Sequence, residues 1–449
     1  MTALPQLSES RTIHSGRGSG MVISCGLTDI MFADITTSVV LFFERALDDA
    51  GLADGLAAAL DRVPAFAGRL RAGDGTLDIV CDDEGVPMTT FDLGETLNEA
   101  IGRVTLPGSG LADHVDAPLA RAGGHPLLKV RVSRLADGGT ALGCSWHHAV
   151  GDMQSFMLLM RAWSAAVEGN PLPEVLIVPD REAYLDEVLP AEDLGRPGIR
   201  LLDDDEAARL EGEIGAAIMT GRTVQVYFGP DEAGRMRSEF SAAAGQRLST
   251  NDSLCAHIVT TIRQLDEDQE ARNLATSVDI RRRLGLPSSV VGNLTNELHL
   301  SAAPGTAPEV LAARIRDAVD DFEHSHLSIR ASRAFLEKIG RTRIRDCVPV
   351  GFDLSRRTFS FNSWSRFGIY DVTFEGQRPA YFSPAASVQL PWTSWLADGF
   401  GGTGFLYTVV VPARLVARMR TPEGRAAIHR FREADDALPA LAGAARKLI

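Results

Sequence analysis

The sequence predicts an α/β protein built from two domains, and three observations support this prediction. The chain has 449 residues, of which 45 % are hydrophobic and 23 % charged, which is the balance of a folded protein with ample core. Segments with helical periodicity alternate with segments of strand periodicity in both halves. Between the halves, an acidic stretch over residues 185–222 interrupts this alternation.

The first half begins with a helix that is followed by strands. Apolar residues at helical spacing over residues 52–63 predict a helix, and Pro64 is a natural stop for it. Residues 76–80 (TLDIV) have the composition of a strand. Over residues 128–133 apolar side chains alternate with polar ones, which predicts a half-buried strand.

A histidine pair lies where the next predicted strand gives way to a helix. The strand TALGCSW ends at His147 and His148, and large apolar residues from Met153 to Trp163 then mark one face of a helix. Junctions of this kind expose side chains.

We place the domain boundary in the acidic segment. The predicted parts are an N-terminal domain over residues 1–190, a crossover segment over 191–222 and a C-terminal domain over 223–449. The second half restarts with the predicted strand TVQVYF, and its further elements are helices near 230–240 and 251–266 and strands at 277–281, TFSFNSW and YTVVV.

Charge and cysteine content exclude several classes of protein. Forty-five Lys and Arg against 59 Asp and Glu give a net charge of −14, so we expect no nucleic-acid partner, and a phosphate-bearing ligand needs a local basic site. The five cysteines are widely spaced without a CxxC pair, which predicts neither a disulfide framework nor a zinc site and favours a reducing cytoplasm. No signal peptide or membrane-spanning run is expected.

His148 is the candidate general base. A neutral imidazole, with a reference pKa near about 6.5, can take a proton from an alcohol or an amine. Asp152, four residues later, is equally suited to capping the helix that begins at Met153, and His147 is suited to packing. His324 and His326 lack a nearby third ligand, so no metal site is predicted. The sequence contains no GxSxG or Walker motif and no GxGxxG that opens a helix, so the hydrolase, NTPase and dinucleotide-binding interpretations lack support.

The stretch around His148 resembles the HxxxD site of the BAHD family of acyl-CoA-dependent acyltransferases, and further blocks agree in order along the chain. PAFAGRL resembles the family's YPLAGRL block, and LSTNDSLCAHI resembles the start of a helix in its C-terminal domain. VDIRRRL followed by Gly292 and Asn293 resembles VDxRxRL…GN, and NSW with the segment after it resembles TSW…DFGWG. In that last motif only Phe374 survives, which is typical of a distant, microbial branch.

The resemblance implies a fold and a mechanism. It implies two similar chloramphenicol-acetyltransferase-like domains, each a mainly antiparallel mixed sheet flanked by helices, with a channel between them and His148 midway. His148 would deprotonate the acceptor as it attacks the thioester and then return the proton to the CoA sulfur, without a covalent intermediate. Asp152 would pair with Arg281 or Arg283 and hold the site in place. Asn362, at the position of the family's Thr, would donate to the oxyanion, or else satisfy backbone at a strand edge.

Binding residues are also implied. Arg281, Arg282 and Arg283 form a basic cluster for the CoA phosphates. The other implied binding residues are Ser249 and Thr250 for CoA, which are equally suited to capping a helix, and His147 and Trp364 for substrate.

The sequence therefore predicts a cytoplasmic acyltransferase that moves an acyl group from acyl-CoA, a co-substrate rather than a bound cofactor, to a hydroxyl or amine of a small molecule in secondary metabolism. Two alternatives stay open. The segment from His147 to Asp152 also resembles the HHxxxDG motif of condensation domains, with Met153 in place of Gly, so an acyl carrier protein is an alternative donor. A lyase, isomerase or binding protein that reuses the fold is the other.

Overall fold

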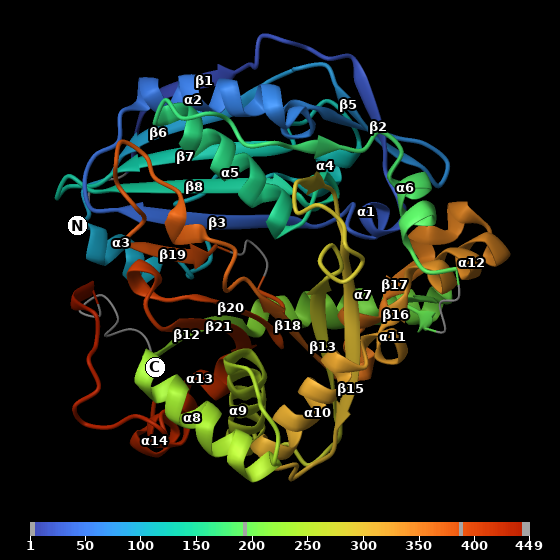
Figure 1. Ribbon diagram of the computed structural model, residues 1–449, viewed down its shortest axis with the longest axis vertical. Coiled ribbons are helices and arrows are strands. Elements are labelled where there is room, and N and C mark those ends of the chain that lie inside the picture. Colours follow the sequence, from blue (N-terminus) through green and yellow to red (C-terminus); the bar gives the residue numbers. More distant parts are fainter. Residues whose placement is uncertain (1–4, 192–194, 386–388, 442–449) are drawn as a thin grey trace. The chain divides into compact units, whose positions relative to one another are not determined.

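The computed structural model of the chain describes residues 5–191, 195–385 and 389–441 (Figure 1). Within these ranges the chain forms two compact units. The first comprises Met1–Ala191, Asp279–Thr295 and Arg366–Ser387, and the second comprises Glu192–Val278, Asn296–Ser365 and Val388–Ile449. Two late segments thus belong to the first unit, which the sequence did not indicate, and the three-part division stays a prediction.

The first unit contains a six-stranded mixed sheet with strand order β1-β6-β7-β8-β3-β19. Only the β6–β7 pair among these neighbours is parallel. The strands are β1 (Gln6–Ile13), β6 (Val86–Asp92), β7 (Leu128–Arg134), β8 (Thr140–His147), β3 (Thr36–Phe43) and β19 (Tyr381–Pro384). Every residue of β8 is buried, and the strand lies inside the sheet between β7 and β3.

Helices α2 (Asp49–Arg62) and α5 (Met153–Val167) pack against each other over one face of this sheet (Figure 1). The first unit also contains a three-stranded sheet and short elements. These are β2 (Met21–Ser24), β5 (Leu77–Cys81), β4 (Arg69–Ala72), β9 (Leu176–Ile177), β14 (Val290–Val291), α1 (Leu27–Met31), α3 (Leu97–Arg103), α4 (Ala117–Arg121) and α6 (Arg181–Val188). The predicted helix over 52–63 is confirmed as α2, and the predicted strands before the histidine pair as β7 and β8.

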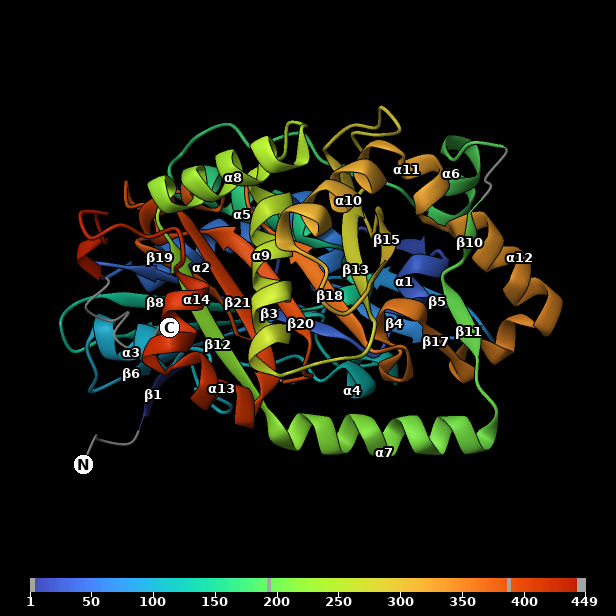
Figure 2. The same ribbon diagram turned by 90° about the horizontal axis from the view of Figure 1, so that it is seen from below.

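The second unit contains another six-stranded mixed sheet, with order β12-β21-β20-β18-β13-β15. Helices α8 (Pro230–Ala244), α9 (Thr250–Leu265) and α10 (Pro308–Asp320) pack side by side on one face of it (Figure 2). The strands are β12 (Gly221–Phe228), β21 (Phe405–Pro412), β20 (Thr393–Asp398), β18 (Thr358–Ser363), β13 (Arg272–Asp279) and β15 (Thr295–Ala302).

Smaller elements complete the second unit. They are β10 (Arg196–Pro197), β11 (Ile199–Leu201), α7 (Asp204–Thr220), α11 (Phe322–Ser325), β16 (Leu327–Ser328), α12 (Ile329–Ile339), β17 (Cys347–Pro349), α13 (Ala413–Met419) and α14 (Pro422–Ile428). None of the helices in the described residues is both long and apolar enough to cross a bilayer.

Candidate active site

His148 lies on a short 3-10 turn, His148–Val150, between the end of β8 and the start of α5. Its backbone N–H donates to the carbonyl of Ile35 at 2.9 Å, which ties the turn to the residue just before β3. The imidazole is half-buried, and its ring centroid lies 4.4 Å from that of Phe32. Burial lowers the pKa of His148 below its ordinary value, so the ring is neutral near pH 7.

The neighbouring histidine faces the interior. His147 is fully buried, and its Nδ1 accepts the backbone N–H of Ala149 at 3.2 Å. Burial lowers the pKa of His147 to about 4. The predicted substrate contact of His147 is therefore wrong for this structure, because successive side chains of a strand point to opposite sides and this one points into the core.

Two acceptors, the backbone carbonyl of His148 itself and the side-chain amide of Asn293, decide which nitrogen of His148 carries a proton. The side-chain Nδ2 of Asn293 donates to the carbonyl of His148 and to Asp29 Oδ1, both at 2.8 Å. Because both partners are acceptors, the amide must present Oδ1 to the imidazole, whose Nδ1 lies 3.0 Å away. Nδ1 of His148 therefore bears the hydrogen, and Nε2 keeps a free lone pair.

Asp152 holds the turn from its other end. It is the N-cap of α5, where Oδ1 accepts the backbone N–H of Ser155, and it forms a two-point ion pair with Arg281 at 2.8 and 3.1 Å. Burial acts to raise the pKa of Asp152, but Arg281 and the backbone donors lower it below its ordinary value. The expected pairing with an arginine of the VDIRRRL block is present, and the capping alternative holds as well.

Arg281 does not have the exposure that a phosphate ligand requires. Only 2 % of it is exposed, and its guanidinium also donates to the carbonyls of Val290 and Gly292. The prediction that Arg281 binds CoA is therefore wrong. Arg282 and Arg283 are exposed on the same turn.

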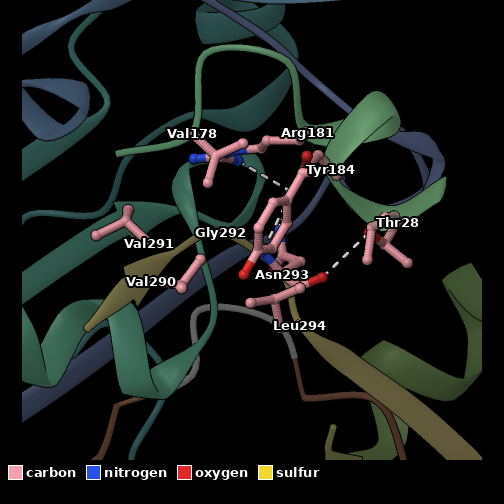
Figure 3. Close-up of a pocket in the computed structure, with 11 residues that line it drawn as sticks. Thr28, Val178, Arg181, Tyr184, Val290, Val291, Gly292, Asn293 and Leu294 are labelled. Carbon is pink, nitrogen blue, oxygen red and sulfur yellow. Dashed lines mark hydrogen bonds and ion pairs between the residues drawn. The ribbon is translucent and has the colours of Figure 1, made fainter. Parts of the chain in front are cut away.

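Asn293 also lines a small pocket of the first unit, where Arg181, Tyr184 and Thr28 surround it (Figure 3). The full lining is Thr28, Asp29, Val178, Arg181, Tyr184, Leu185, Val290, Val291, Gly292, Asn293 and Leu294. Gly292 has a φ of 149°, a conformation that favours glycine, and Asn293 follows it directly. The sequence contained this pair as a motif but gave Asn293 no role, and nothing in it pointed to Asp29 or Arg181.

The other predicted binding residues lie in the second unit. Ser249 is the N-cap of α9 and shares a capping box with Asp252, which is the structural alternative for this serine. The Asp252 carboxylate occupies the helix N-terminus that was expected to attract phosphate, and Thr250 is the first residue of that helix. A CoA site at this terminus therefore loses its physical basis.

Asn362 and Trp364 lie at and just after the end of β18. Asn362 is half-buried and stands opposite Trp395 in the register of β18 and β20. Trp364 is 9 % exposed, and its ring centroid lies 6.1 Å from that of Trp395. Their predicted roles in oxyanion and substrate binding stay predictions.

The segment that departs from the family's DFGWG motif is built into the first unit. Phe374 is fully buried and makes edge contacts with Phe43 and Trp163, at centroid distances of 5.8 and 5.3 Å. Glu375 accepts the backbone N–H of Asp48, the N-cap of α2, at 2.7 Å. The altered segment thus keeps a packing role.

Comparisons with known proteins cover most of the chain. A family model described as "Transferase family" matches residues 24–411. Rosmarinate synthase of Plectranthus scutellarioides is 25 % identical over 366 residues, 77 % of this chain and 80 % of that protein. Agmatine hydroxycinnamoyltransferase 1 of Oryza sativa subsp. japonica is 25 % identical over 390 residues, 81 % of this chain and 84 % of that protein.

The fold has a counterpart among solved structures. F. graminearum TRI101 complexed with ethyl coenzyme A superposes with a TM-score of 0.68 at 15 % identity, covering 90 % of this chain and 98 % of that one. This similarity concerns the fold, and it confirms the predicted α/β class with two acyltransferase-like domains.

Proposed function

This chain belongs to the Transferase family, the BAHD acyltransferases, and from that premise we propose that it transfers an acyl group from acyl-CoA to a hydroxyl or amine of a small molecule in secondary metabolism. The observation that carries the proposal is the protonation state and tautomer of His148. A neutral imidazole with its hydrogen on Nδ1 offers Nε2 as the base that such a transfer needs.

Nε2 of His148 takes the proton from the acceptor while the acceptor oxygen or nitrogen attacks the thioester carbonyl. The tetrahedral intermediate collapses, the carbon–sulfur bond breaks, and the proton on Nε2 passes to the CoA sulfur. Proton transfer of this kind contributes about 10²–10⁴-fold to a rate. The thiol of CoA has a pKa near that of free cysteine, about 8.5, so proton removal matters more than proton return.

We also propose residues for the remaining functions. We assign the oxyanion donor to the amide of Asn362 and a substrate contact to Trp364, both beside β20 in the second sheet. Loss of one oxyanion donor costs about 2.7–4 kcal/mol in other enzymes. Arg282 and Arg283 are the exposed basic pair for the CoA phosphates, which a chain of net charge −14 must attract locally.

The test is product formation from a panel of acyl-CoA thioesters with alcohols and amines, followed by mass spectrometry. Agmatine and other amines belong in the panel because agmatine appears in the name of a relative. We expect acylated product and released CoA thiol in equal amounts, only when an acceptor is present. His148→Ala should abolish product, whereas His324→Ala, a matched change at an exposed histidine of the second unit, should not. Full activity of His148→Ala would refute the mechanism.

An acyl carrier protein is the second candidate donor, favoured by the adjacent pair His147 and His148 with Asp152. The panel therefore includes the same acyl group on CoA and on a carrier-protein pantetheine arm. Turnover with the carrier-bound acyl group alone would show that the carrier protein, and not CoA, delivers the acyl group. If His148→Ala binds the acceptor normally but has lost turnover, a pure binding protein is excluded.

A further inference from the structure

We infer that Asp29 is a positioning residue that fixes the orientation of the Asn293 amide and thereby, together with the backbone carbonyl of His148, holds the hydrogen of the imidazole on Nδ1; this inference rests on the proposed function. Asp29 lies in α1 and is 1 % exposed. Its Oδ1 accepts the side-chain Nδ2 of Asn293 at 2.8 Å and the backbone N–H of Asn293 at 3.3 Å. Its Oδ2 accepts the N–H of Gly26 at 2.9 Å.

A side-chain amide is nearly symmetrical in shape, so packing alone does not fix its orientation. A flipped Asn293 would place its oxygen against the carboxylate of Asp29 and the carbonyl of His148, and two acceptors facing an acceptor repel. It would also present NH₂ to Nδ1 of His148. Only the backbone carbonyl of His148 would then favour hydrogen on Nδ1, so the population with hydrogen on Nε2, which is the wrong tautomer for a base, would rise.

The carboxylate of Asp29 therefore orients the Asn293 amide better than a neutral residue of the same shape would. A carboxylate accepts at both oxygens, from Asn293 at Oδ1 and from Gly26 at Oδ2, whereas an asparagine at position 29 must turn its NH₂ toward one of these donors and so holds the amide less firmly. Asp29 lies 264 residues away from Asn293 in the chain, so this contact is a product of the fold.

Arg181 compensates the buried charge. Its guanidinium lies 3.0 Å from Asp29 Oδ1, and its side chain is 6 % exposed. The same guanidinium donates to the carbonyls of Ala149 and Val150, at 2.9 and 2.8 Å. These are the two residues that follow His148, so one buried ion pair holds both the turn that carries the imidazole and the amide that orients it.

The test measures the tautomer directly. In protein labelled with ¹⁵N-histidine, the ¹⁵N shifts of His148, assigned by comparison with His148→Ala, should show hydrogen on Nδ1 and a bare Nε2. In Asp29→Asn we expect a mixture with hydrogen on Nε2. We also expect kcat to fall about 10–100-fold, the usual effect of losing an outer hydrogen-bond partner, with KM changed less than threefold.

A double variant separates action through Asn293 from a general structural role. If Asp29 acts through Asn293, Asp29→Asn should add less than about threefold to the kcat loss of Asn293→Ala. Asp49→Asn is the matched control, since Asp49 is 6 % exposed and pairs with Arg134 in the same unit. It should leave the tautomer and kcat unchanged.

Three results would overturn the inference. They are a wild-type His148 with hydrogen on Nε2, an unchanged tautomer in folded Asp29→Asn, and fully multiplicative kcat losses in the double variant. The wild-type spectrum needs no variant to fold. The tautomer also requires no turnover, so failure of the acyl-transfer proposal is distinguishable from failure of this one.

Discussion

The carboxylate of Asp152 and the guanidinium of Arg281 meet in two parallel hydrogen bonds of 2.8 and 3.1 Å, and both side chains are buried. Asp152 is the last residue of the HxxxD motif and caps α5, whereas Arg281 lies just after the end of β13 at Asp279. The pair therefore joins the turn of His148 to a segment that lies 129 residues later in the sequence. Loss of this ion pair should therefore lower the stability of the fold more directly than it impairs proton transfer.

Asp152→Ala should lower the free energy of unfolding by about 3–5 kcal/mol, because it removes the two-point partner of the buried Arg281 and leaves only the partly exposed carboxylate of Asp279, 3.2 Å away, to balance its charge. Urea unfolding followed by circular dichroism measures this. Arg281→Lys keeps the charge but loses the two-point geometry, so its loss should be smaller. A folded Asp152→Ala enzyme of full stability and full activity would contradict the assignment.

The same pair predicts an acid dependence of stability. Because the pKa of Asp152 is lowered in the folded state, its stabilising contribution is present above the unfolded value of about 3.9 and is lost as the pH falls through the folded pKa. The stability difference between wild type and Asp152→Asn should therefore shrink below about pH 4. A difference that grows on acidification has the wrong sign and would argue against an ionised Asp152.

The activity profile should follow His148. Its pKa lies below the ordinary value of about 6.5 because burial disfavours the imidazolium, so the base form should dominate at and above that pH. We expect the acid limb of kcat/KM, with an alcohol as acceptor, to have its midpoint below pH 6.5. Steady-state rates from pH 4.5 to 8 measure it. A midpoint above 7 would mean that burial does not control this imidazole.

Part of this site was predictable from local sequence patterns. The alternation before His147 and the helical face after Asp152 are periodic signals, and they placed the histidine pair at a strand–helix junction, which the structure confirms. The pairing of Asp152 with an arginine came from the family resemblance rather than from spacing. Arg281 was also assigned to CoA because three arginines in a row look like a basic surface cluster.

The site residues that the sequence did not reveal are brought together by tertiary contacts. Asn293, Asp29 and Arg181 meet only after the chain has folded, and no periodicity links three isolated polar residues so far apart. In the same way, the burial of Arg281 beside two exposed arginines depends on the turn after β13, whose side-chain directions a strand period does not reveal.

Phe374 provides a test of the altered motif. Phe374→Ala removes a fully buried ring between Phe43 and Trp163, so unfolding should become easier by about 3–5 kcal/mol. The ring has no contact with His148 among the aromatic contacts of the described residues. The KM values of the folded fraction should therefore stay within about twofold, and thermal unfolding with steady-state kinetics checks both. A selective rise in KM without loss of stability would assign this segment to substrate binding instead.

The paired substitution Arg282→Ala and Arg283→Ala should raise KM for acyl-CoA and leave kcat nearly unchanged, because the two exposed cations attract phosphate and do not touch the reacting atoms. The wild-type KM should increase with salt, and the increase should be smaller in the variant. An acyl-pantetheine without the nucleotide phosphates is the matched substrate and should not distinguish the two proteins.

Ser249→Ala, by contrast, should cost about 1 kcal/mol of stability through the lost cap and should leave KM for acyl-CoA unchanged. If Ser249→Ala raises KM for acyl-CoA and the arginine variant does not, the phosphates bind at α9 despite Asp252.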